Sequence, residues 1–345
     1  ILPVELYLKD AETNWGAERF WQVPTLFWFN TRDELLHMIC LFGAGASLMI
    51  MANFFAGWAL LMAWVFYLSI FNVAQPFLGF QWDTLLLETG FLSLFLVSWR
   101  GYINGAESSP SWFVIFLLRF LLFRVVFSSG LVKLISQDPT WADLTALYYH
   151  YETQPLPTWI GWHAHQLPQA FQEFSVVCVF IIQLGVVFLI FGPRRIRYIG
   201  CAVLVLFDLL IILTGNYGFF NLLTIALCLL LLDDTVFARW LPTKGKKSKA
   251  SIFVLKKISL LKVGVMGLCI MLYAVPLLTK NHPSIYVYIA KAIRPFHIFN
   301  SYGLFAVMTT SRPEIIILGS NDRENWLPYE FKWKPGNVEK VPEFV

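Results

Sequence analysis

The chain is poor in charged residues. Only 14% of its 345 residues are Asp, Glu, Lys or Arg, while 57% are hydrophobic and the mean hydropathy is +0.62. Soluble domains carry about 25% charged residues, because polar side chains must cover their surface. This composition therefore excludes an ordinary soluble domain and indicates a protein whose solvent is lipid.

Several signatures of common chemistries are also missing. Each cysteine lies alone in an apolar run without a CxxC partner, which predicts neither a disulfide framework nor a zinc site. The sequence contains no GxSxG, P-loop or GxGxxG motif. The net charge of +4 comes mainly from two short loops and does not indicate a nucleic-acid partner. The five cysteines are Cys40, Cys178, Cys201, Cys228 and Cys269.

Long apolar runs are what the chain has in place of these motifs. A helix needs about 20 mostly apolar residues to cross a bilayer, and eight runs approach that length. The predicted fold class is an all-α polytopic membrane protein with about eight transmembrane helices, followed by the start of a small extracytoplasmic β-domain. The runs are 34–50, 56–72, 77–98, 112–135, 174–191, 198–214, 217–232 and 254–278.

Positive charge in the loops predicts the orientation. Arg194, Arg195 and Arg197 join the fifth and sixth runs, and a cluster of Arg239 with four lysines joins the seventh and eighth. Two helices separate these loops, so both lie on one side, which the positive-inside rule makes cytoplasmic. The loop 136–173 contains no Lys or Arg and is then extracytoplasmic.

Three regions follow from this count. Residues 1–33 form an extracytoplasmic N-terminal segment, residues 34–278 the transmembrane domain, and residues 279–345 an extracytoplasmic C-terminal region. The chain opens on Ile1 and stops at Val345 inside a β-rich stretch, so we expect both ends to lack further portions.

The C-terminal region carries the signals of strands. The stretches EIIILGS (314–320) and YEFKWK (329–334) are rich in β-branched and aromatic residues. Asn321-Asp322 separates them, and Pro335-Gly336 follows. Such runs bounded by turn residues predict strands.

The loop 136–173 is rich in aromatic residues and prolines. Rings at this position are typical of an aromatic belt at the membrane surface. The alternative is a folded cap over a cavity, which the prolines favour because they fix turns.

Charged residues inside the apolar runs are candidate functional residues, because burying a charge in lipid is costly. At about 1.5 Å per residue, Glu88 and Arg124 share a level near the middle of the membrane, and Asp83 lies nearer Lys133. An unpaired buried charge costs several kcal/mol, so we expect the acids of the third run to pair with cations of the fourth. The buried charges are Asp83, Glu88, Arg119, Arg124, Lys133 and Asp208.

Lys133 lies close to the outer surface and follows Ser128-Ser129-Gly130. A lysine in an apolar pocket can serve as a base, which makes Lys133 the candidate catalytic residue. The alternative is a side chain that reaches to the interface. His150, His163 and His165 have no acidic partner at ligand spacing, so no metal site is predicted.

The motifs of the chain resemble the lipase maturation factor family. The string QWDTLLLETGF (81–91) is similar to a family motif, as are FR at 123–124 with GLVKL at 130–134, DPTW at 138–141 and LT at 144–145. YHYETQPLP (149–157) is highly specific and contains His150, Tyr151, Glu152 and Gln154. Further matches are LTGNY (213–217), NLLT (221–224), Asp233-Asp234, SRPEI (311–315), GSND (319–322) and Trp326.

The resemblance implies a multi-pass protein that helps secreted dimeric lipases reach an active fold. Eukaryotic members reside in the endoplasmic reticulum, and their lumenal C-terminal part is thought to contact the client lipase. The implied partners are membrane lipids and a secreted lipase or another exported protein. No cofactor is expected for such a folding factor.

A more distant likeness is to the vitamin K-dependent γ-glutamyl carboxylase. Gly130, Lys133, Leu134, Asp138 and Trp141 are similar to a stretch of that family, whose base lysine falls on Lys133. This favours a second hypothesis, a membrane enzyme with a bound quinone or lipid-soluble substrate. The spacing from the lysine to the tryptophan differs, however, and position 132 is valine here.

No catalytic constellation is visible, so the folding factor is favoured over the enzyme. A subunit of a larger membrane complex is the third hypothesis. The compartment follows the source: the endoplasmic reticulum membrane in a eukaryote, or the inner membrane in a bacterium. No Asn begins an N-x-Ser/Thr sequon and the outside regions hold no Cys, which favours the bacterial case.

Overall fold

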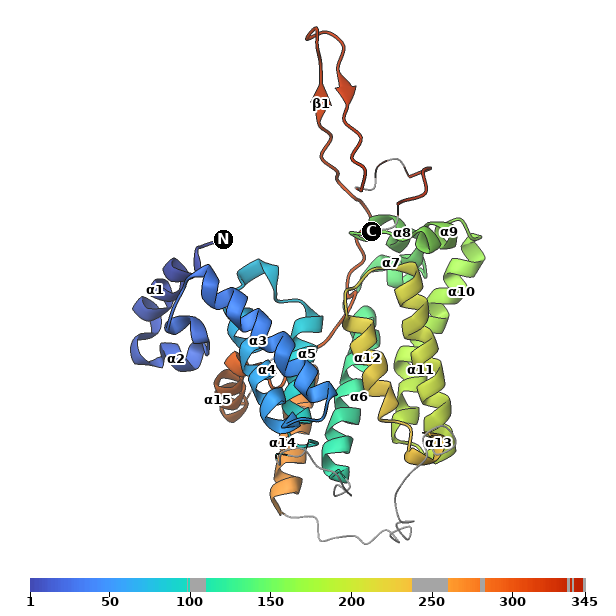
Figure 1. Ribbon diagram of the computed structural model, residues 1–345. Coiled ribbons are helices and arrows are strands. Elements are labelled where there is room, and N and C mark those ends of the chain that lie inside the picture. Colours follow the sequence, from blue (N-terminus) through green and yellow to red (C-terminus); the bar gives the residue numbers. More distant parts are fainter. Residues whose placement is uncertain are drawn as a thin grey trace. The chain divides into compact units, whose positions relative to one another are not determined.

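The computed structural model describes most of the chain, and helices dominate it (Figure 1). The chain divides into two compact units. The first comprises Ile1–Leu121 with Asp233–Ser301, and the second comprises Leu122–Leu232 with Tyr302–Val345. The C-terminal region therefore contributes to both units. The described residues are 1–97, 99, 110–237, 260–279, 283–333, 336 and 338–343.

The first unit is helical in all of its described elements. In chain order these are α1 (Val4–Trp15), η1 (Gly16–Glu18), α2 (Arg19–Gln22), η2 (Leu26–Trp28), α3 (Asp33–Met51), α4 (Ala56–Phe71), η3 (Gln75–Phe77), α5 (Gln81–Ser93), the first part of α6 (Trp112–Ile135), α13 (Asp234–Phe237), α14 (Leu260–Leu278), α15 (Ser284–Ile293) and η6 (Arg294–Phe296). The η elements named here are single turns of 3₁₀-helix.

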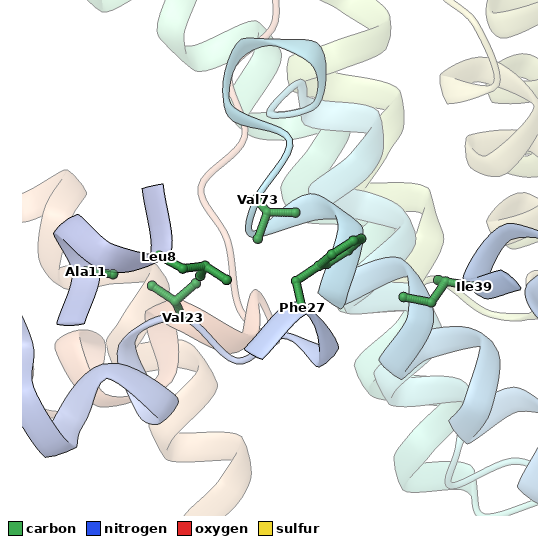
Figure 2. Close-up of a cluster of buried hydrophobic side chains, with 6 residues drawn as sticks. All are labelled: Leu8, Ala11, Val23, Phe27, Ile39 and Val73. Carbon is green, nitrogen blue, oxygen red and sulfur yellow. The ribbon is translucent and has the colours of Figure 1, made fainter. Parts of the chain in front are cut away.

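The N-terminal segment folds against the beginning of α3. Leu8 and Ala11 lie one helical turn apart in α1, so their side chains share a face. Both are almost fully buried. Figure 2 shows the cluster that they enter, in which the other members are Val23, Phe27, Ile39 and Val73.

Helices α3 and α4 form an antiparallel pair joined by a short turn. Asn53 and Phe55 adopt left-handed backbone conformations in that turn, which reverses the chain within four residues. Ala46 of α3 is only 2% exposed, and Ala59 of α4 is 0% exposed. Such small residues allow two helix backbones to approach closely within a membrane.

The second unit contains a helical bundle, three short helices and a hairpin. Its elements are the last part of α6, α7 (Pro139–Ala142), α8 (Ala146–Thr153), α9 (Trp159–His165), α10 (Gln169–Phe180), η4 (Ile181–Gly185), η5 (Val186–Phe191), α11 (Arg194–Thr214), α12 (Phe220–Leu229), β1 (Leu318–Gly319) and β2 (Leu327–Pro328). Helix α10 continues into a π-helical turn, η4, and then into a 3₁₀ turn, η5.

Four helical stretches in the described part of the chain are long and apolar enough to cross a membrane. They are Asp33–Met51, Trp112–Ile135, Gln169–Phe191 and Arg194–Thr214. The fourth predicted run, 112–135, coincides with α6. Helices α4 and α12 have 16 and 10 residues, and the longest helix in the described residues of the predicted run 77–98 is α5, with 13 residues. The finding is therefore a membrane protein with four clear candidate spans.

The loop 136–173 folds into α7, α8 and α9, which together with their connections form the cap (residues 137–168). The cap lies at the C-terminal end of α11, because Gln154 Nε2 donates to the carbonyl oxygen of Thr214 and Thr158 Oγ1 donates to that of Leu213. The arginine-rich loop lies at the other end of α11, which begins at Arg194. The second predicted basic loop, with Arg239, lies outside the described residues.

The predicted strands form only a small antiparallel hairpin. Leu318 pairs with Pro328 and Gly319 with Leu327, so each strand has two residues. The expectation of a strand over 329–334 was wrong for residues 329–333, since the second described strand is Leu327–Pro328, and residue 334 lies outside the described part of the chain. Pro328 has no N–H to donate, and this limits the ladder on that side.

Asp83 stabilises the start of α5. Its Oδ2 accepts hydrogen bonds from the backbone N–H groups of Gly79 and Phe80, each at 3.0 Å. Its Oδ1 accepts from Tyr67 Oη of α4 at 2.6 Å. An acidic side chain at the third helical position that reaches back to the N-cap amide stabilises a helix start. Asp83 therefore also ties α5 to α4.

We expect Asp83→Ala to lower the free energy of unfolding by about 2–4 kcal/mol, because three donors lose a charged acceptor. Thermal unfolding of the purified protein in detergent measures this. Asp10→Ala, at an exposed position of α1, is the matched control. Equal melting temperatures for the two variants would contradict the capping role.

Candidate functional site

Lys133 lies at the centre of the second unit. Its side chain is only 4% exposed, and Nζ donates hydrogen bonds to the carbonyl oxygens of Ser129 and Leu304, each at 2.8 Å. The ammonium also lies 5.0 Å from the ring centroid of Trp141 and 6.0 Å from that of Phe305. Carbonyl oxygens and aromatic faces both stabilise a positive charge. Lys133 is therefore an internal side chain, and its catalytic role stays a prediction.

Residues 302–312, here called the strap, run along α6 and the cap. Leu304 is held at both of its backbone groups, because its N–H donates to Ser129 Oγ at 3.2 Å and its carbonyl accepts from Lys133. Gly303 lies close to Val132, so an added Cβ would come within 3.3 Å of that side chain. The strap is therefore docked on α6 by polar contacts and by close packing.

The strap is also fastened to the first helix of the cap. Trp141 Nε1 donates to the carbonyl oxygen of Phe305 at 2.9 Å, and Asp138 Oδ2 accepts from the N–H of Met308 at 2.8 Å. Asp138 Oδ1 accepts from the N–H and the hydroxyl of Thr140. Burial acts to raise the pKa of Asp138, but these hydrogen bonds outweigh it and hold the pKa below its ordinary value.

His150 and Tyr217 form a polar pair between the cap and the α11–α12 turn. His150 Nε2 and Tyr217 Oη are 2.9 Å apart, and the two rings are stacked with an interplanar angle of 22°. Tyr217 Oη also donates to Gln154 Oε1 at 3.2 Å. Phe305 of the strap contacts both rings edge-on. This pair thus connects the YHYETQPLP and LTGNY motifs.

The environment of this pair keeps it uncharged. Burial lowers the pKa of His150 from 6.5 to about 4, and the positive charge of Lys133 adds to this effect. Burial raises the pKa of Tyr217, and Tyr151 adds to that shift. The pKa of Tyr151 is itself raised by burial. At neutral pH the three side chains are therefore neutral hydrogen-bonding groups.

Arg312 binds the end of the YHYETQPLP segment (149–157), which is here called the motif loop. Its guanidinium donates to the carbonyl oxygens of Glu152 at 3.3 Å, Gln154 at 2.8 Å and Pro155 at 3.0 Å. Its Nε donates to Glu314. The carboxylate of Glu152 pairs with His165 Nε2 at 2.8 Å, within the cap. The planar fork of arginine suits several acceptors at once, so Arg312 fixes the geometry of this loop.

The remaining predicted charges have partners that sequence reasoning missed. Asp208 is 5% exposed and accepts from Asn221 Nδ2 at 2.9 Å. In the first unit, Glu88 is 1% exposed, and its Oε2 accepts from the backbone N–H and the side-chain amide of Asn300. An asparagine on another element can donate to a buried carboxylate, and the sequence carries no spacing signal for such a pair.

The predicted pairing of Glu88 with Arg124 joins residues of different units and stays a prediction. Within the second unit, the guanidinium of Arg124 lies 5.7 Å from the ring centroid of Tyr302 in the strap. Arg119 is half-buried in the part of α6 that belongs to the first unit. In the described ranges, no group of three or more His, Cys, Asp or Glu residues is placed to hold a metal ion.

Because His150 resists protonation when folded, acid destabilises the protein. Between pH 6.5 and about 4 the unfolded chain binds a proton at this residue that the folded chain does not, so stability falls as the pH falls. We expect a loss of about 1–3 kcal/mol from this group across that window. His150→Gln should flatten the dependence of melting temperature on pH, whereas His37→Gln, at an exposed position, should not. Equal slopes for both variants would contradict this assignment.

We expect Arg312→Lys to loosen the motif loop, because a lysine ammonium cannot reproduce a fork that contacts three carbonyls. The melting temperature should fall by the equivalent of about 1–3 kcal/mol. Deuterium exchange should accelerate in peptides covering 150–156 and 306–312. Arg323→Lys, at the exposed tip of the hairpin, is the control. Unchanged exchange in both peptides would show that the clamp is dispensable.

Comparison with known proteins places this arrangement in a family. Residues 1–239 match the lipase maturation factor transmembrane domain, and residues 298–345 match the lipase maturation factor C-terminal domain. The strap thus belongs to the second match and the rest of the site to the first. No solved structure matches the chain significantly.

Similar relatives include lipase maturation factor 2 of Xenopus laevis, with 35% identity over 94% of this chain and 62% of that protein. The human lipase maturation factor 2 is 32% identical over 100% of this chain and 65% of its own length. Lipase maturation factor 1 of Bos taurus is 31% identical over 99% and 66%. The chain spans a little under two thirds of these relatives. The resemblance of the motifs is confirmed, and this membrane protein belongs to the lipase maturation factor family.

Proposed function

We propose that the chain is a membrane-embedded chaperone that assists the folding and assembly of secreted dimeric lipases or other exported proteins. Two features support this proposal: the names of the relatives, which refer to lipase maturation, and the apolar hairpin of the second unit. The site around Lys133 then holds the hairpin, which is the part that would face the client, in a fixed position.

The exposed hairpin, residues 315–331, is the observation that carries the proposal. Ile315 is 80% exposed, Ile316 70%, Leu327 72% and Tyr329 65%. Contiguous exposed apolar side chains of this kind mark sites of protein interaction. The unpaired strand edges can in addition accept an extended segment of a partner through main-chain hydrogen bonds. A partly folded lipase offers both apolar side chains and unpaired strands.

The placement that goes with this function is a chain of eight spans. In it, α4, α5, α12 and α14 cross or enter the bilayer beside the four long spans, and the cap and the C-terminal region face the exported side. In a eukaryotic cell that side is the lumen of the endoplasmic reticulum, and in a bacterium it is the periplasm. The absence of Lys and Arg from residues 136–173 supports this orientation.

We expect the double substitution Ile316→Asp and Leu327→Asp to reduce secretion of active lipase at least several-fold in cells that depend on this protein. Both side chains are exposed, so the melting temperature of the purified protein should change little. Val338→Asp, 64% exposed but outside the hairpin, is the matched control. Full lipase rescue by the double variant at normal expression would refute the role of the hairpin.

The carboxylase-like enzyme with Lys133 as base is the competing proposal, with a quinone or another lipid-soluble molecule as its substrate. A base needs a neutral amine, whereas the carbonyl oxygens that accept from Nζ of Lys133 and the ring of Trp141 at 5.0 Å stabilise the ammonium form. These contacts favour a structural cation. A role as a subunit of a larger membrane complex is the third proposal. The exposed hairpin supports it too, because it could contact another subunit.

Substitution of Lys133 by two residues separates these proposals. Arginine keeps the positive charge and its hydrogen bonds but cannot act as a base, whereas methionine removes the charge. If Lys133 is structural, we expect Lys133→Arg to retain most lipase rescue and Lys133→Met to lower both rescue and melting temperature. Loss of rescue in both variants at unchanged melting temperature would favour the enzyme.

A further inference from the structure

A cavity of about 250 Å³ opens in the second unit between the cap and the α11–α12 turn. Leu156, Trp159 and Ile212 lie on its wall with Tyr217, Asn221 and Glu343. Helix α11, a candidate span, ends at Thr214, and α12 begins at Phe220. Ile212 and Asn221 therefore place the cavity beside the end of a candidate span, where a membrane surface is expected.

The volume limits what the cavity can hold. Pockets for drug-sized ligands usually measure about 300–1,000 Å³. A space of about 250 Å³ accepts a compact head group, but neither a folded peptide nor a full acyl chain. The apolar wall at Leu156 and Ile212 suits the first carbon atoms attached to such a group.

The charges around the cavity select a cation. Glu343 is the one charged residue that lines the described cavity, and no ion pair within the described part of the chain joins it to a lysine or arginine. An anionic ligand would meet a carboxylate without a compensating cation, whereas a cationic ligand would be attracted.

Two aromatic side chains add to the preference of the cavity for a cationic ligand. Trp159 is 51% exposed, and Trp159 and Tyr217 both line the cavity. Tyr217 is held in place by its hydrogen bonds to His150 and Gln154. Tryptophan and tyrosine faces combined with a carboxylate are the surroundings that bind alkylammonium groups.

From this geometry we propose that the cavity binds an alkylammonium group, as carried by the head group of a zwitterionic phospholipid. The ammonium lies between Trp159, Tyr217 and Glu343, and the glycerol end lies toward Leu156 and Ile212. This site would anchor the outer end of the bundle to choline- or ethanolamine-bearing lipids. The inference concerns lipid recognition and does not depend on the proposed lipase role.

Calorimetric titration of the full chain in detergent tests the proposal, with dihexanoylphosphatidylcholine as the probe and dihexanoylphosphatidylglycerol as its anionic counterpart. We expect the choline lipid to bind and the glycerol lipid to bind about tenfold more weakly or not at all. Phosphorylcholine alone distinguishes the source: weaker binding assigns the site to a lipid, and equal binding assigns it to a soluble amine. Equal affinity for the two lipids would overturn the proposal.

Variants locate the binding in this cavity. Glu343→Gln and Trp159→Leu should each weaken binding of the choline lipid about tenfold. Trp159→Phe keeps an aromatic face and should retain most of the affinity, which guards against a fold defect in the leucine variant. Glu330→Gln and Trp326→Leu, both at exposed positions of the C-terminal region, are the controls. Wild-type affinity in Glu343→Gln and Trp159→Leu would place the lipid elsewhere and refute the site.

Discussion

Burying the ammonium of Lys133 within an apolar bundle obliges the chain to bring oxygen atoms to it. One of these oxygens is local, on Ser129 one turn earlier, but the other belongs to Leu304, 171 residues later in the sequence. The rest of the site follows from that requirement. Once Leu304 is fixed against α6, the strap must pass Trp141 and Asp138, and this brings Arg312 to the end of the motif loop.

The strap unites the two parts of the family architecture. It belongs to the C-terminal domain by sequence, yet its polar backbone groups are satisfied by the transmembrane domain. For the client binding proposed above, a rigid base is an advantage, since a loosely tethered surface would lose binding energy to ordering. The neutral pair of His150 and Tyr217 adds to this rigidity, because both rings pack on Phe305.

Sequence reasoning recovered what depends on local pattern. The run 112–135 became α6 because its composition alone specifies a helix of spanning length, and the motif strings identified the family. The hydrogen-bond partners of the buried carboxylates were harder to predict from the sequence. Asn300 and Asn221 carry no periodic or charge signal, yet they donate hydrogen bonds to Glu88 and Asp208. Asp83 caps its own helix, with the hydroxyl of Tyr67 and the backbone amides three and four residues earlier as donors, and its expected relation to the cations of the fourth run stays a prediction.

The distant origin of the Leu304 carbonyl has a consequence for biosynthesis. Ribosomes add about 5–20 residues per second, so α6 is complete roughly 10–30 s before Leu304 exists. During that interval Lys133 lacks one of its two acceptors. The second acceptor of Lys133 therefore becomes available only late in synthesis, and the second unit cannot be complete before residue 304 has been added.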